Sequence, residues 1–566
     1  MTKDGTHTMD PSLRKMMFGP AGTLAEAIDR ILAGGRRVAF CLDDNDRLMG
    51  ILTQGDVLRL VRAGVPLDAP ARGHLNADPV TVGHDVDVHE AKKLIGRKIN
   101  LIPQVDAHGR LTGLIDLASS EYGFLNIRQK SVAILGLGYV GLTLALVLAE
   151  HGFTVAGFDV NRPLLDKLAA KEPPFFETGI QGFLDRHVGK RLRLVDSLAQ
   201  VNADIFIITV GTPVDPATKK PGLDYIRKAA TAVGRSLSRD ALVILRSTVQ
   251  VGTTRRVVIP ELEAVSGLKA GQDFHVAYCP ERTAEGRALK ELTHLPQIVG
   301  GLDERSAELA SRLFNEYTPT IVRVDGLEAA EMCKLMDNVY RDVRFAFANQ
   351  VAQVAEPLGL DIHAIIDAVN LNYDRNDIPR PSPGVGGPCL TKDPYILSAV
   401  FQEHGLEAPL IASARRVNEA GPADIVGRAG TMLAAQGKDL ASCKAFVAGF
   451  AFKGHPETSD TRDSTTLFFL RELLARCPNV QGYDPLVPPE EIAALGAGPV
   501  SIEEGFKDAD VVFVMNNHPS YLRWDLPRLF GLAARPTVFY DAWRMFPHLK
   551  SQAPHGILYA AVGVGR

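Results

Sequence analysis

The sequence predicts an α/β protein built from two doubly wound, mostly parallel sheets that a long helix and helical region join, with a smaller α+β module before them. Short apolar runs alternate with helical segments over about 130–245, and the same alternation returns from about 445. A helical apolar rhythm fills much of 326–420 between them. Strands that are apolar throughout are typical of parallel sheets, because helices cover both faces.

The chain length of 566 residues corresponds to about three or four domains. The changes in pattern along the chain place their boundaries near residues 126, 325 and 425. We therefore expect four domains, which span 1–126, 127–325, 326–425 and 426–566.

The first α/β region begins with an apolar strand at 131–135, which a glycine-rich turn and a helix over 142–150 follow. Further strands are predicted at 154–159, 204–210 and 241–246. The order of strand, helix and strand predicts parallel pairing with crossover helices.

The second α/β region repeats this plan after a long helix that we expect over about 328–357. Strands are predicted at 445–450, 480–483 and 510–515, with a helix at about 464–476. The segments 203–206 and 509–512 both begin Ala-Asp and occupy similar places in the two regions. The chain is therefore predicted to contain a duplicated doubly wound architecture.

The first 125 residues contain an internal repeat of strand, polar turn and strand. One copy spans 38–52 and the other spans 101–115, each with an acidic turn in its middle. Helices are expected over 24–33, 57–63 and 88–95. This pattern predicts a small module made of two similar halves.

The bulk composition limits the class of function. The hydrophobic fraction is 46%, the formal net charge is −4 and the isoelectric point is about 6.4. Such a chain has no general attraction to nucleic acid or to anionic membranes, so neither is expected as a partner. Its cysteines lack Cys-x-x-Cys spacing, which disfavours a zinc site or a disulfide framework. With no apolar signal segment or membrane span either, we expect a cytoplasmic protein without a metal.

A dinucleotide-binding turn is predicted at Gly136-Leu-Gly138-Tyr139-Val140-Gly141, which follows a strand and opens a helix. The first glycine allows the tight turn, the second lets the backbone approach a pyrophosphate, and the third lets helix and strand pack. The helix N-terminus faces the phosphates. Asp159 ends the next strand, where a carboxylate accepts from the ribose 2′-hydroxyl and repels a 2′-phosphate. NAD is therefore the expected cofactor.

Cys389 is the predicted nucleophile, within Gly-Val-Gly-Gly-Pro-Cys-Leu-Thr-Lys-Asp at 384–393. We expect the glycine-rich turn to deliver it to the start of a helix, with Lys392 and Asp393 beside the thiol. A helix N-terminus and an ammonium group both lower a thiol pKa, and the thiolate is the reactive form. Lys392 could instead stabilise an oxyanion on the substrate, and Pro394 leaves open that the helix begins later. The remaining cysteines are expected to be small apolar side chains.

The chain resembles the UDP-glucose/GDP-mannose dehydrogenase family over about residues 130–550. The resemblance rests on motifs in matching order and spacing, which are 136–141, 210–213, 247–249, 279–286, 331–338, 384–393, 452–453 with 460–462, and 483–485. It implies a Rossmann-like fold in both α/β regions. It also implies oxidation of C6 of a nucleotide sugar twice, with two NAD consumed per turnover.

The resemblance implies roles for individual residues. Cys389 would attack the C6 aldehyde to give a thiohemiacetal and then a thioester, with Lys334 and Asn338 stabilising the C6 oxygen. Thr248 and Asp393 would position water, and Asp393 and Glu281 are alternative bases. The cofactor contacts would come from the glycine turn with Asp159, Thr212, Thr248 and Lys392. The substrate contacts would come from Glu281, Lys334, Asn338, Gly386, Lys453, Arg462 and an arginine from the neighbouring subunit, which is either Arg375 or Arg380.

Substrate and assembly follow from the resemblance less sharply. Cys279-Pro-Glu-Arg-Thr283 is similar to the branch that acts on UDP-N-acetylhexosamines, which favours UDP-N-acetylglucosamine or UDP-N-acetylmannosamine. UDP-glucose stays an alternative. Members of the family work as dimers or larger assemblies, so a homo-oligomer is expected, with surface polysaccharide synthesis as the setting.

The N-terminal repeat resembles a pair of CBS motifs, which often bind adenine nucleotides between their two copies. Thr53 and Asp56 in the first copy match the ribose-binding pattern, whereas the second copy has Asp116 and Ser119 at those places. The resemblance implies allosteric control by a nucleotide. The alternative is a dimerisation or scaffolding module without a ligand.

Two other functions stay open. A degenerate dehydrogenase could act as a nucleotide-sensing scaffold, or the chain could be a two-electron β-hydroxyacid dehydrogenase, which shares the first α/β region and a Lys–Asn helix. Cys389 with its loop disfavours both. The number of NADH formed per sugar separates the three functions. Two are expected for the four-electron oxidation, one for the two-electron dehydrogenase and none for the scaffold.

Overall fold

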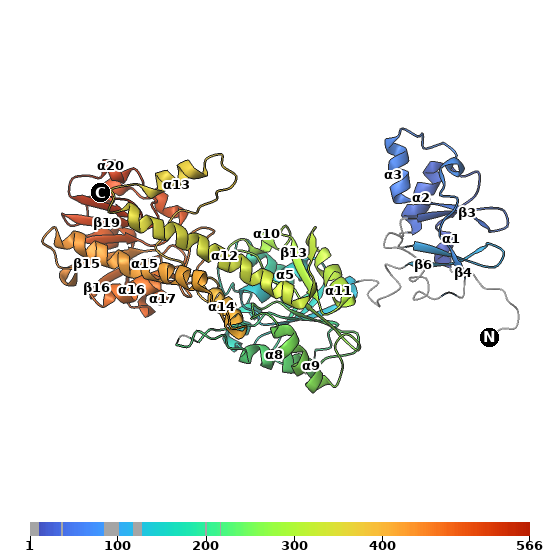
Figure 1. Cartoon of the computed structure of the whole chain (residues 1–566), viewed down its shortest axis with the longest axis horizontal. Helices are drawn as coiled ribbons and strands as arrows, with labels where there is room; N and C mark the ends of the chain where they lie inside the picture. Colours follow the sequence, from blue (N-terminus) through green and yellow to red (C-terminus); the bar gives the residue numbers. More distant parts are fainter. Residues whose placement is uncertain are drawn as a thin grey trace. The chain divides into compact units, whose positions relative to one another are not determined.

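The computed structural model describes residues 11–34, 38–83, 86, 101–116, 127–198, 201–215 and 217–565. The chain divides into two compact units, Met1–Asn126 and Ile127–Arg566 (Figure 1). Within the described residues, no helix has both the length and the apolar content that crossing a membrane requires.

The N-terminal unit contains two small sheets of the same design. Each has a parallel pair followed by an antiparallel pair, and in each the antiparallel register shifts one residue before the turn. The turns match as well, because Asp43 accepts from the backbone N–H of Asn45 and Arg47, and Asp106 accepts from His108 and Arg110. The predicted internal repeat is thus visible in both hairpins.

The elements of this unit are β1 (Met17–Phe18), β2 (Val38–Leu42), β3 (Leu48–Thr53), β4 (Val82–Gly83), β5 (Leu101–Val105), β6 (Leu111–Asp116), α1 (Pro11–Arg14), α2 (Leu24–Gly34), α3 (Gln54–Arg62) and the 3-10 turn η1 (Ala71–His74). The helix expected over 88–95 lies outside the described residues, as does Ser119.

The second unit begins with an eight-stranded sheet whose order is β14-β13-β12-β11-β10-β7-β8-β9. Its strands pair in parallel except for β12 with β13. The chain order reverses beside β7, which lies between β8 and β10. Such a switch point is where open α/β sheets bind nucleotides.

The elements of this part are η2 (Ile127–Gln129), β7 (Ser131–Leu135), α5 (Tyr139–Glu150), β8 (Thr154–Phe158), α6 (Arg162–Ala169), α7 (Ile180–His187), β9 (Leu192–Val195), β10 (Ile205–Ile208), α8 (Asp224–Gly234), β11 (Leu242–Leu245), the π-helical turn η4 (Thr254–Val258), α9 (Ile259–Ser266), β12 (His275–Tyr278), α10 (Ala288–Glu291), β13 (Gln297–Gly301), α11 (Glu304–Asn315) and β14 (Ile321–Arg323).

A 30-residue helix, α12 (Gly326–Ala355), leads from this sheet to the second one, and Figure 1 shows it in yellow. The central region also contains α13 (Ile362–Asn370), α14 (Asp393–Glu403) and α15 (Pro409–Ala434). Helix α15 continues nine residues beyond the boundary that the sequence placed at 425, so the helical region runs into the last domain.

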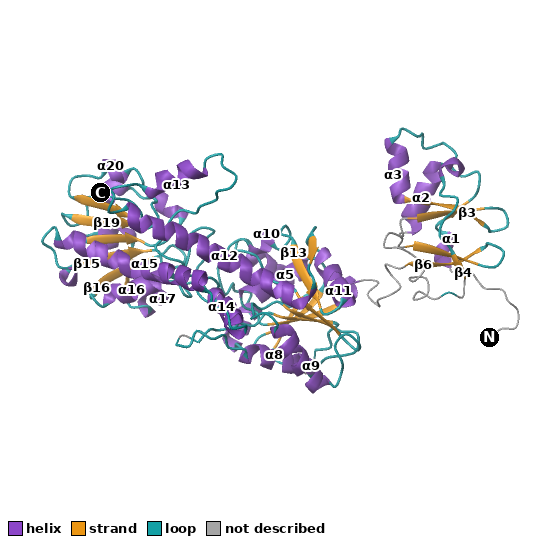
Figure 2. Ribbon diagram, viewed as in Figure 1, coloured by secondary structure: helices purple, strands orange, loops and turns teal. Residues whose placement is uncertain are grey.

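The second sheet has the order β17-β16-β15-β18-β19-β20, and all of its strand pairs are parallel. Strands β9-β8-β7-β10-β11-β12 of the first sheet follow the same order, which is the duplication that the sequence predicted. Helices flank the strands of both sheets (Figure 2). On β18, Val511 and Phe513 belong to one core and Val512 and Val514 to the other, so the strand is apolar at every position because both faces are covered.

The elements of the last part are η5 (Leu440–Ser442), β15 (Lys444–Ala448), α16 (Thr465–Leu474), β16 (Asn479–Tyr483), α17 (Pro489–Ala494), β17 (Gly498–Pro499), α18 (Ile502–Phe506), β18 (Val511–Val514), η6 (Pro519–Arg523), α19 (Leu526–Phe530), β19 (Thr537–Asp541), α20 (Leu549–Gln552) and β20 (Ile557–Ala561).

Candidate active site

The glycine turn at the end of β7 has the geometry that a dinucleotide requires. Gly136 has a φ of +95°, which favours glycine, and Gly138 immediately precedes α5. A Cβ on Gly141 would lie 1.8 Å from the Gly136 carbonyl oxygen, so only glycine allows this packing of helix against turn. The N-terminus of α5 therefore points unpaired N–H groups at the switch point, where a pyrophosphate would bind.

Asp159 lies at the end of β8, beside this turn. Its Oδ2 accepts from the backbone N–H of Leu137 at 2.7 Å and its Oδ1 from Asn161 at 2.8 Å. The carboxylate thus holds the turn in place, and each oxygen retains a lone pair for a ribose hydroxyl. Arg162 pairs with Asp166 and Asp196 instead of with Asp159. These residues fit NAD.

Tyr139 and Val140 are the first two residues of α5. The Tyr139 hydroxyl donates to Glu177 and accepts from the backbone N–H of Gly286 at 2.7 Å, and Gly286 also donates to Glu177. Burial raises the pKa of the Tyr139 hydroxyl. This side chain therefore ties the cofactor turn to the 281–286 loop, a contact that spacing in the sequence does not reveal.

Thr212 and Thr248 follow β10 and β11, the strands next to the switch point. The Thr212 hydroxyl donates to the Thr248 carbonyl oxygen at 2.5 Å. Their loops therefore leave the same edge of the sheet side by side, as expected at the carboxyl ends of parallel strands.

Cys389 does not begin a helix, contrary to the sequence prediction. Helix α14 starts at Asp393, with Lys392 before it and Pro394 in its first turn, a position that proline favours. The backbone N–H of Asp393 donates to the Cys389 carbonyl oxygen at 2.9 Å. The thiol therefore lies on a turn that ends where α14 begins.

The glycines of this turn are needed for close packing. Gly386 approaches the Asp463 carbonyl and the Thr465 backbone, where a Cβ would come within 2.7 Å. Gly387 has a φ of +93° and donates to the Asp463 carbonyl oxygen at 2.8 Å. The C-terminal domain therefore holds one side of the Cys389 turn.

The pKa of the Cys389 thiol is raised, whereas the sequence argument expected it to be lowered. Solvent reaches one side of the Cys389 side chain, while protein groups surround the thiol on its other sides. The resulting loss of hydration raises the pKa of the thiol above the ordinary 9.0. Asp393 raises it further, while Lys334 and Lys392 lower it. The pKa is therefore raised and not lowered, because the thiol is buried, lacks a helix N-terminus beside it and lies near the Asp393 carboxylate.

Lys334 and Asn338 are buried on one face of α12, not solvated. The Lys334 Nζ donates to the Glu281 carbonyl oxygen at 2.5 Å, and the Asn338 Nδ2 donates to Asp393 Oδ2 at 2.6 Å. Lys392 donates to the other oxygen of Asp393 at 2.7 Å. Asn338 and Lys392 therefore meet at Asp393, whereas Lys334 binds the backbone of the 281–286 loop.

Glu281 forms a buried ion pair that the sequence did not predict. Arg246, which follows β11, donates to Glu281 Oε2 from Nε at 3.0 Å and from Nη2 at 2.5 Å. Burial alone would raise the pKa of Glu281, but Arg246 and the backbone N–H of Thr283 hold it below its ordinary value. This arrangement disfavours Glu281 as a proton acceptor. A charged residue directly after an apolar strand was the available signal for Arg246.

Two cations of the C-terminal domain converge on Glu285. The Lys453 Nζ donates to the Glu285 carbonyl oxygen at 2.7 Å, and the Arg462 Nη2 lies 3.8 Å from its carboxylate. Arg462 also chelates Asp460. Burial and Asp460 raise the pKa of Glu285 to about 7. Both predicted substrate cations therefore lie where the C-terminal domain meets the 281–286 loop.

Arg375 and Arg380 are exposed on the segment after α13. Arg375 lies over the ring of Tyr373, and Arg380 pairs with Asp367 on α13 at 3.0 Å. The structure of one chain thus gives neither side chain a contact with the Cys389 turn.

In the N-terminal unit, Thr53 and Asp56 form the capping box of α3. The Asp56 backbone N–H donates to Thr53 Oγ1, and the Thr53 N–H donates to Asp56 Oδ2. These contacts give the Thr-x-x-Asp pattern a structural purpose that needs no nucleotide.

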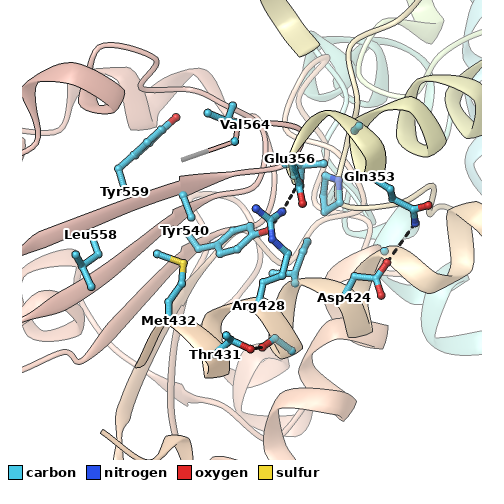
Figure 3. Close-up of a pocket in the computed structure, with 18 of the residues that line it drawn as sticks. Gln353, Glu356, Asp424, Arg428, Thr431, Met432, Tyr540, Leu558, Tyr559 and Val564 are labelled. Carbon is cyan, nitrogen blue, oxygen red and sulfur yellow. Dashed lines mark hydrogen bonds and ion pairs between the residues drawn. The ribbon is translucent and has the colours of Figure 1, made fainter. Parts of the chain in front are cut away.

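Two cavities of the second unit differ in their relation to the reaction residues. One encloses about 1120 Å³ between α12, α15 and strands β19 and β20 (Figure 3). Along its wall Arg428 pairs with Glu356, and the Gln353 amide donates to Asp424. A smaller cavity of about 440 Å³ borders Thr391 and Lys392. The reaction residues therefore do not line the larger of these two cavities.

Comparison with known proteins identifies the family. Models of the UDP-glucose/GDP-mannose dehydrogenase family match residues 130–318 (NAD binding domain), 328–420 (central domain) and 446–548 (UDP binding domain). The chain belongs to the UDP-glucose/GDP-mannose dehydrogenase family. It is accordingly an NAD-dependent nucleotide-sugar dehydrogenase. A CBS domain model matches residues 15–63, which is the first of the two N-terminal repeats.

Individual relatives of this family cover most of the second unit. The chain is 32% identical over 448 residues to UDP-N-acetyl-D-mannosamine dehydrogenase of Pyrococcus horikoshii, across 77% of this chain and 99% of the relative. It is 30% identical to NDP-N-acetyl-D-galactosaminuronic acid dehydrogenase of Ralstonia nicotianae, across 72% and 95%. The solved structure of a UDP-glucose dehydrogenase from Pyrobaculum islandicum matches with a TM-score of 0.68 and 29% identity, across 77% and 98%. The relatives named UDP-N-acetyl-D-mannosamine dehydrogenase fit the UDP-N-acetylhexosamine branch of the family.

The glycine turn yields a prediction that separates binding from folding. A Cβ on Gly138 would meet no atom within 4 Å, so Gly138→Ala should keep the melting temperature within ~2 °C. It should weaken NAD at least ~10-fold, because the added methyl group occupies the approach of the pyrophosphate. Calorimetric titration with NAD measures this. Gly141→Ala is the contrast, since its Cβ clashes with the chain itself and should destabilise the fold.

Glu285 should make stability depend on pH. Because its pKa is about 7 in the folded chain and ordinarily 4.5, the folded state retains a proton that the unfolded state releases between these values. Its favourable contribution is complete below about pH 4.5 and is lost as the pH rises through about 7. Glu285→Gln stays neutral, so its melting temperature should rise relative to wild type between about pH 5 and about pH 8.

The control is the exposed Glu503→Gln, which should show no such trend. Equal differences between Glu285→Gln and wild type at both pH values would contradict the assignment.

Proposed function

We propose that the chain oxidises C6 of a UDP-N-acetylhexosamine to the uronate in two steps, with Cys389 as the nucleophile. The convergence of Lys334, Asn338, Lys392 and Asp393 around the Cys389 turn carries this proposal. UDP-N-acetylmannosamine and UDP-N-acetylglucosamine are the favoured substrates, which the names of the relatives support. UDP-glucose is the alternative.

Bound NAD supplies the hydride acceptor for both oxidations, and Gly136, Gly138, Gly141, Asp159, Thr212, Thr248 and Lys392 would hold it. After the first oxidation, the Cys389 sulfur bonds to the C6 aldehyde carbon and the carbonyl electrons move to oxygen. Lys334 and Asn338 stabilise that oxygen, because an ammonium group and an amide that are both buried donate strong hydrogen bonds. Loss of the C6 hydrogen as hydride leaves a thioester.

Hydrolysis of the thioester releases the product. Water adds to C6, the carbon–sulfur bond breaks, and the thiolate returns to Cys389. We infer that Asp393 and Thr248 orient this water. Asp393 and Glu281 both stand in ion pairs, with Lys392 and Arg246 respectively, and Glu281 is the less favoured proton acceptor because its pKa is lowered. The balance is one alcohol, two NAD+ and one water giving one carboxylate, two NADH and three protons.

The UDP part of the substrate requires cations at a distance from C6. Lys453 and Arg462 supply them from the UDP-binding domain, and Glu285 holds them toward the 281–286 loop. Gly386 contributes backbone without a side chain next to Thr465. These contacts support a binding mode in which the nucleotide lies on the C-terminal domain and the sugar reaches Cys389.

Substrate and mechanism can be tested together. A panel of UDP- and GDP-sugars should give two NADH per molecule of the correct sugar. Cys389→Ser should lower uronate formation by roughly 10³-fold or more, because a serine hydroxyl ionises far less readily than a thiol. Cys333→Ser on α12 is the matched control and should stay active. Uronate release at the wild-type rate by Cys389→Ser would refute the assignment of Cys389 as the nucleophile.

We infer that two copies pair through α12 and α13. Large apolar side chains are exposed along one side of α12, namely Met336, Tyr340, Phe347 and Val354, and on or after α13, namely Ile365, Val369, Leu371 and Tyr373. Such a stripe marks a protein interface. It would bring Arg375 and Arg380 next to the other copy. Sedimentation should show a dimer that Phe347→Asp dissociates, and a monomeric wild-type chain would refute the pairing.

We also propose that the N-terminal unit binds an adenine nucleotide and alters catalysis. The two matching hairpins and the CBS domain model that matches residues 15–63 support this. A ligand-free dimerisation or scaffolding module is the alternative, which the capping box favours. Calorimetry with AMP, ADP and ATP should detect binding that Asp56→Asn abolishes. Nucleotides that neither bind nor change the rate would refute regulation.

A further inference from the structure

Arg415, in the second turn of α15, is among the largest fully buried side chains of the described residues, with 1% of its surface exposed. Its Nε lies 3.3 Å from Asp342 Oδ2 on α12, and Asp342 is fully buried too. Burying such a pair is expensive in free energy and contributes little net stability. A charged pair at this depth therefore calls for a purpose beyond holding two helices together.

The remaining donors of Arg415 bind the backbone on both sides of Cys389. Its Nη1 donates to the Leu390 carbonyl oxygen at 2.6 Å, and its Nη2 donates to the Val385 carbonyl oxygen at 3.4 Å. Val385 and Leu390 bracket the segment Gly-Gly-Pro-Cys at 386–389. One guanidinium group therefore binds the backbone at both ends of the turn that carries the thiol.

A second set of hydrogen bonds fixes the start of the same turn. Asn418, on the Arg415 face of α15, donates to Asp342 Oδ1 at 2.8 Å and accepts from Asn349 at 2.9 Å. Asn349 accepts from the backbone N–H of Ser382 at 2.8 Å, and the Ser382 hydroxyl donates to the Gly384 carbonyl oxygen at 2.8 Å. The network runs from α12 through α15 to the turn.

The position of Asp342 on α12 connects this network to Lys334 and Asn338. Lys334, Asn338 and Asp342 follow one another at intervals of four residues, so they share one face of the helix. The face that presents the donors for the substrate oxygen therefore also anchors the guanidinium that holds the thiol turn. Gly384 and Gly387 in this segment have left-handed backbone conformations and carry no side chain to fix them.

We propose that Arg415 is a positioning residue that sets the Cys389 backbone in register with Lys334 and Asn338 through Asp342. This inference rests on the proposed function of Cys389. Arg415 contacts the backbone of the turn and not the substrate. Its contribution is to geometry, since attack on a carbonyl carbon tolerates displacements of only a fraction of an ångström.

Arg415→Lys tests the proposal, because one ammonium group cannot reach Asp342 and both carbonyl oxygens together. We expect kcat to fall roughly 10- to 100-fold while the KM for nucleotide sugar and for NAD stays within about threefold. The pH profile of Cys389 alkylation by iodoacetamide, followed on the Cys389 peptide by mass spectrometry, should shift toward that of an ordinary thiol. Arg428→Lys is the matched control on the same helix, since Arg428 pairs with Glu356 and makes no hydrogen bond to the turn.

Asn349→Ala is the second variant if Arg415→Lys does not fold, and it should show the same separation of kcat from KM. Unchanged kcat per folded enzyme together with a wild-type alkylation profile would overturn the proposal. Loss of activity that only follows the folded fraction, measured by thermal unfolding, would overturn it equally. The alkylation profile needs no substrate, so it distinguishes failure here from an active Cys389→Ser, which would overturn the proposed function.

Discussion

The hydrogen bond between Asn338 and Asp393 is the contact on which the site depends. It joins α12, which carries the predicted oxyanion donors, to the first residue of α14, which follows the Cys389 turn directly. Asp393 is fully buried, Lys392 balances its charge, and Asn338 supplies a hydrogen bond from a different element. A buried carboxylate without both donors would be costly. The same contact therefore satisfies Asp393 and fixes the spacing between thiol and helix.

The duplicated sheets explain how substrate and cofactor come together. In both sheets the loops leave the carboxyl ends of the strands, and those of the first sheet carry the glycine turn, Thr212, Thr248 and the 281–286 loop. The loops of the second sheet carry Lys453 and Arg462, and they meet the first set at Glu285. Tyr139 and Glu177 bind the other side of the same segment through Gly286. The 281–286 loop is therefore in contact with both halves of the chain.

Periodicity and motif spacing predicted the strands, the glycine turn and the long helix, because each of these depends on residues close in sequence. Lys334 and Asn338 could be placed on one face of α12 for the same reason. The start of α14 was predicted too early, since the preference of proline for a first helical turn moved the helix to Asp393. Arg246 and Arg415 were missed because their partners, Glu281 and Asp342, lie 35 and 73 residues away in the chain. The place of Arg246 directly after an apolar strand was a local signal for its charge, but no local pattern signals Arg415 or the distant partner of either arginine.

The groups around Cys389 act on its thiol in opposite directions. Burial raises the pKa of the thiol and Asp393 raises it further, whereas Lys334 and Lys392 favour the thiolate. Asp393 is itself bound by Asn338 and Lys392. The contact that fixes the Cys389 turn to α12 therefore also fixes a negative charge that acts on the sulfur.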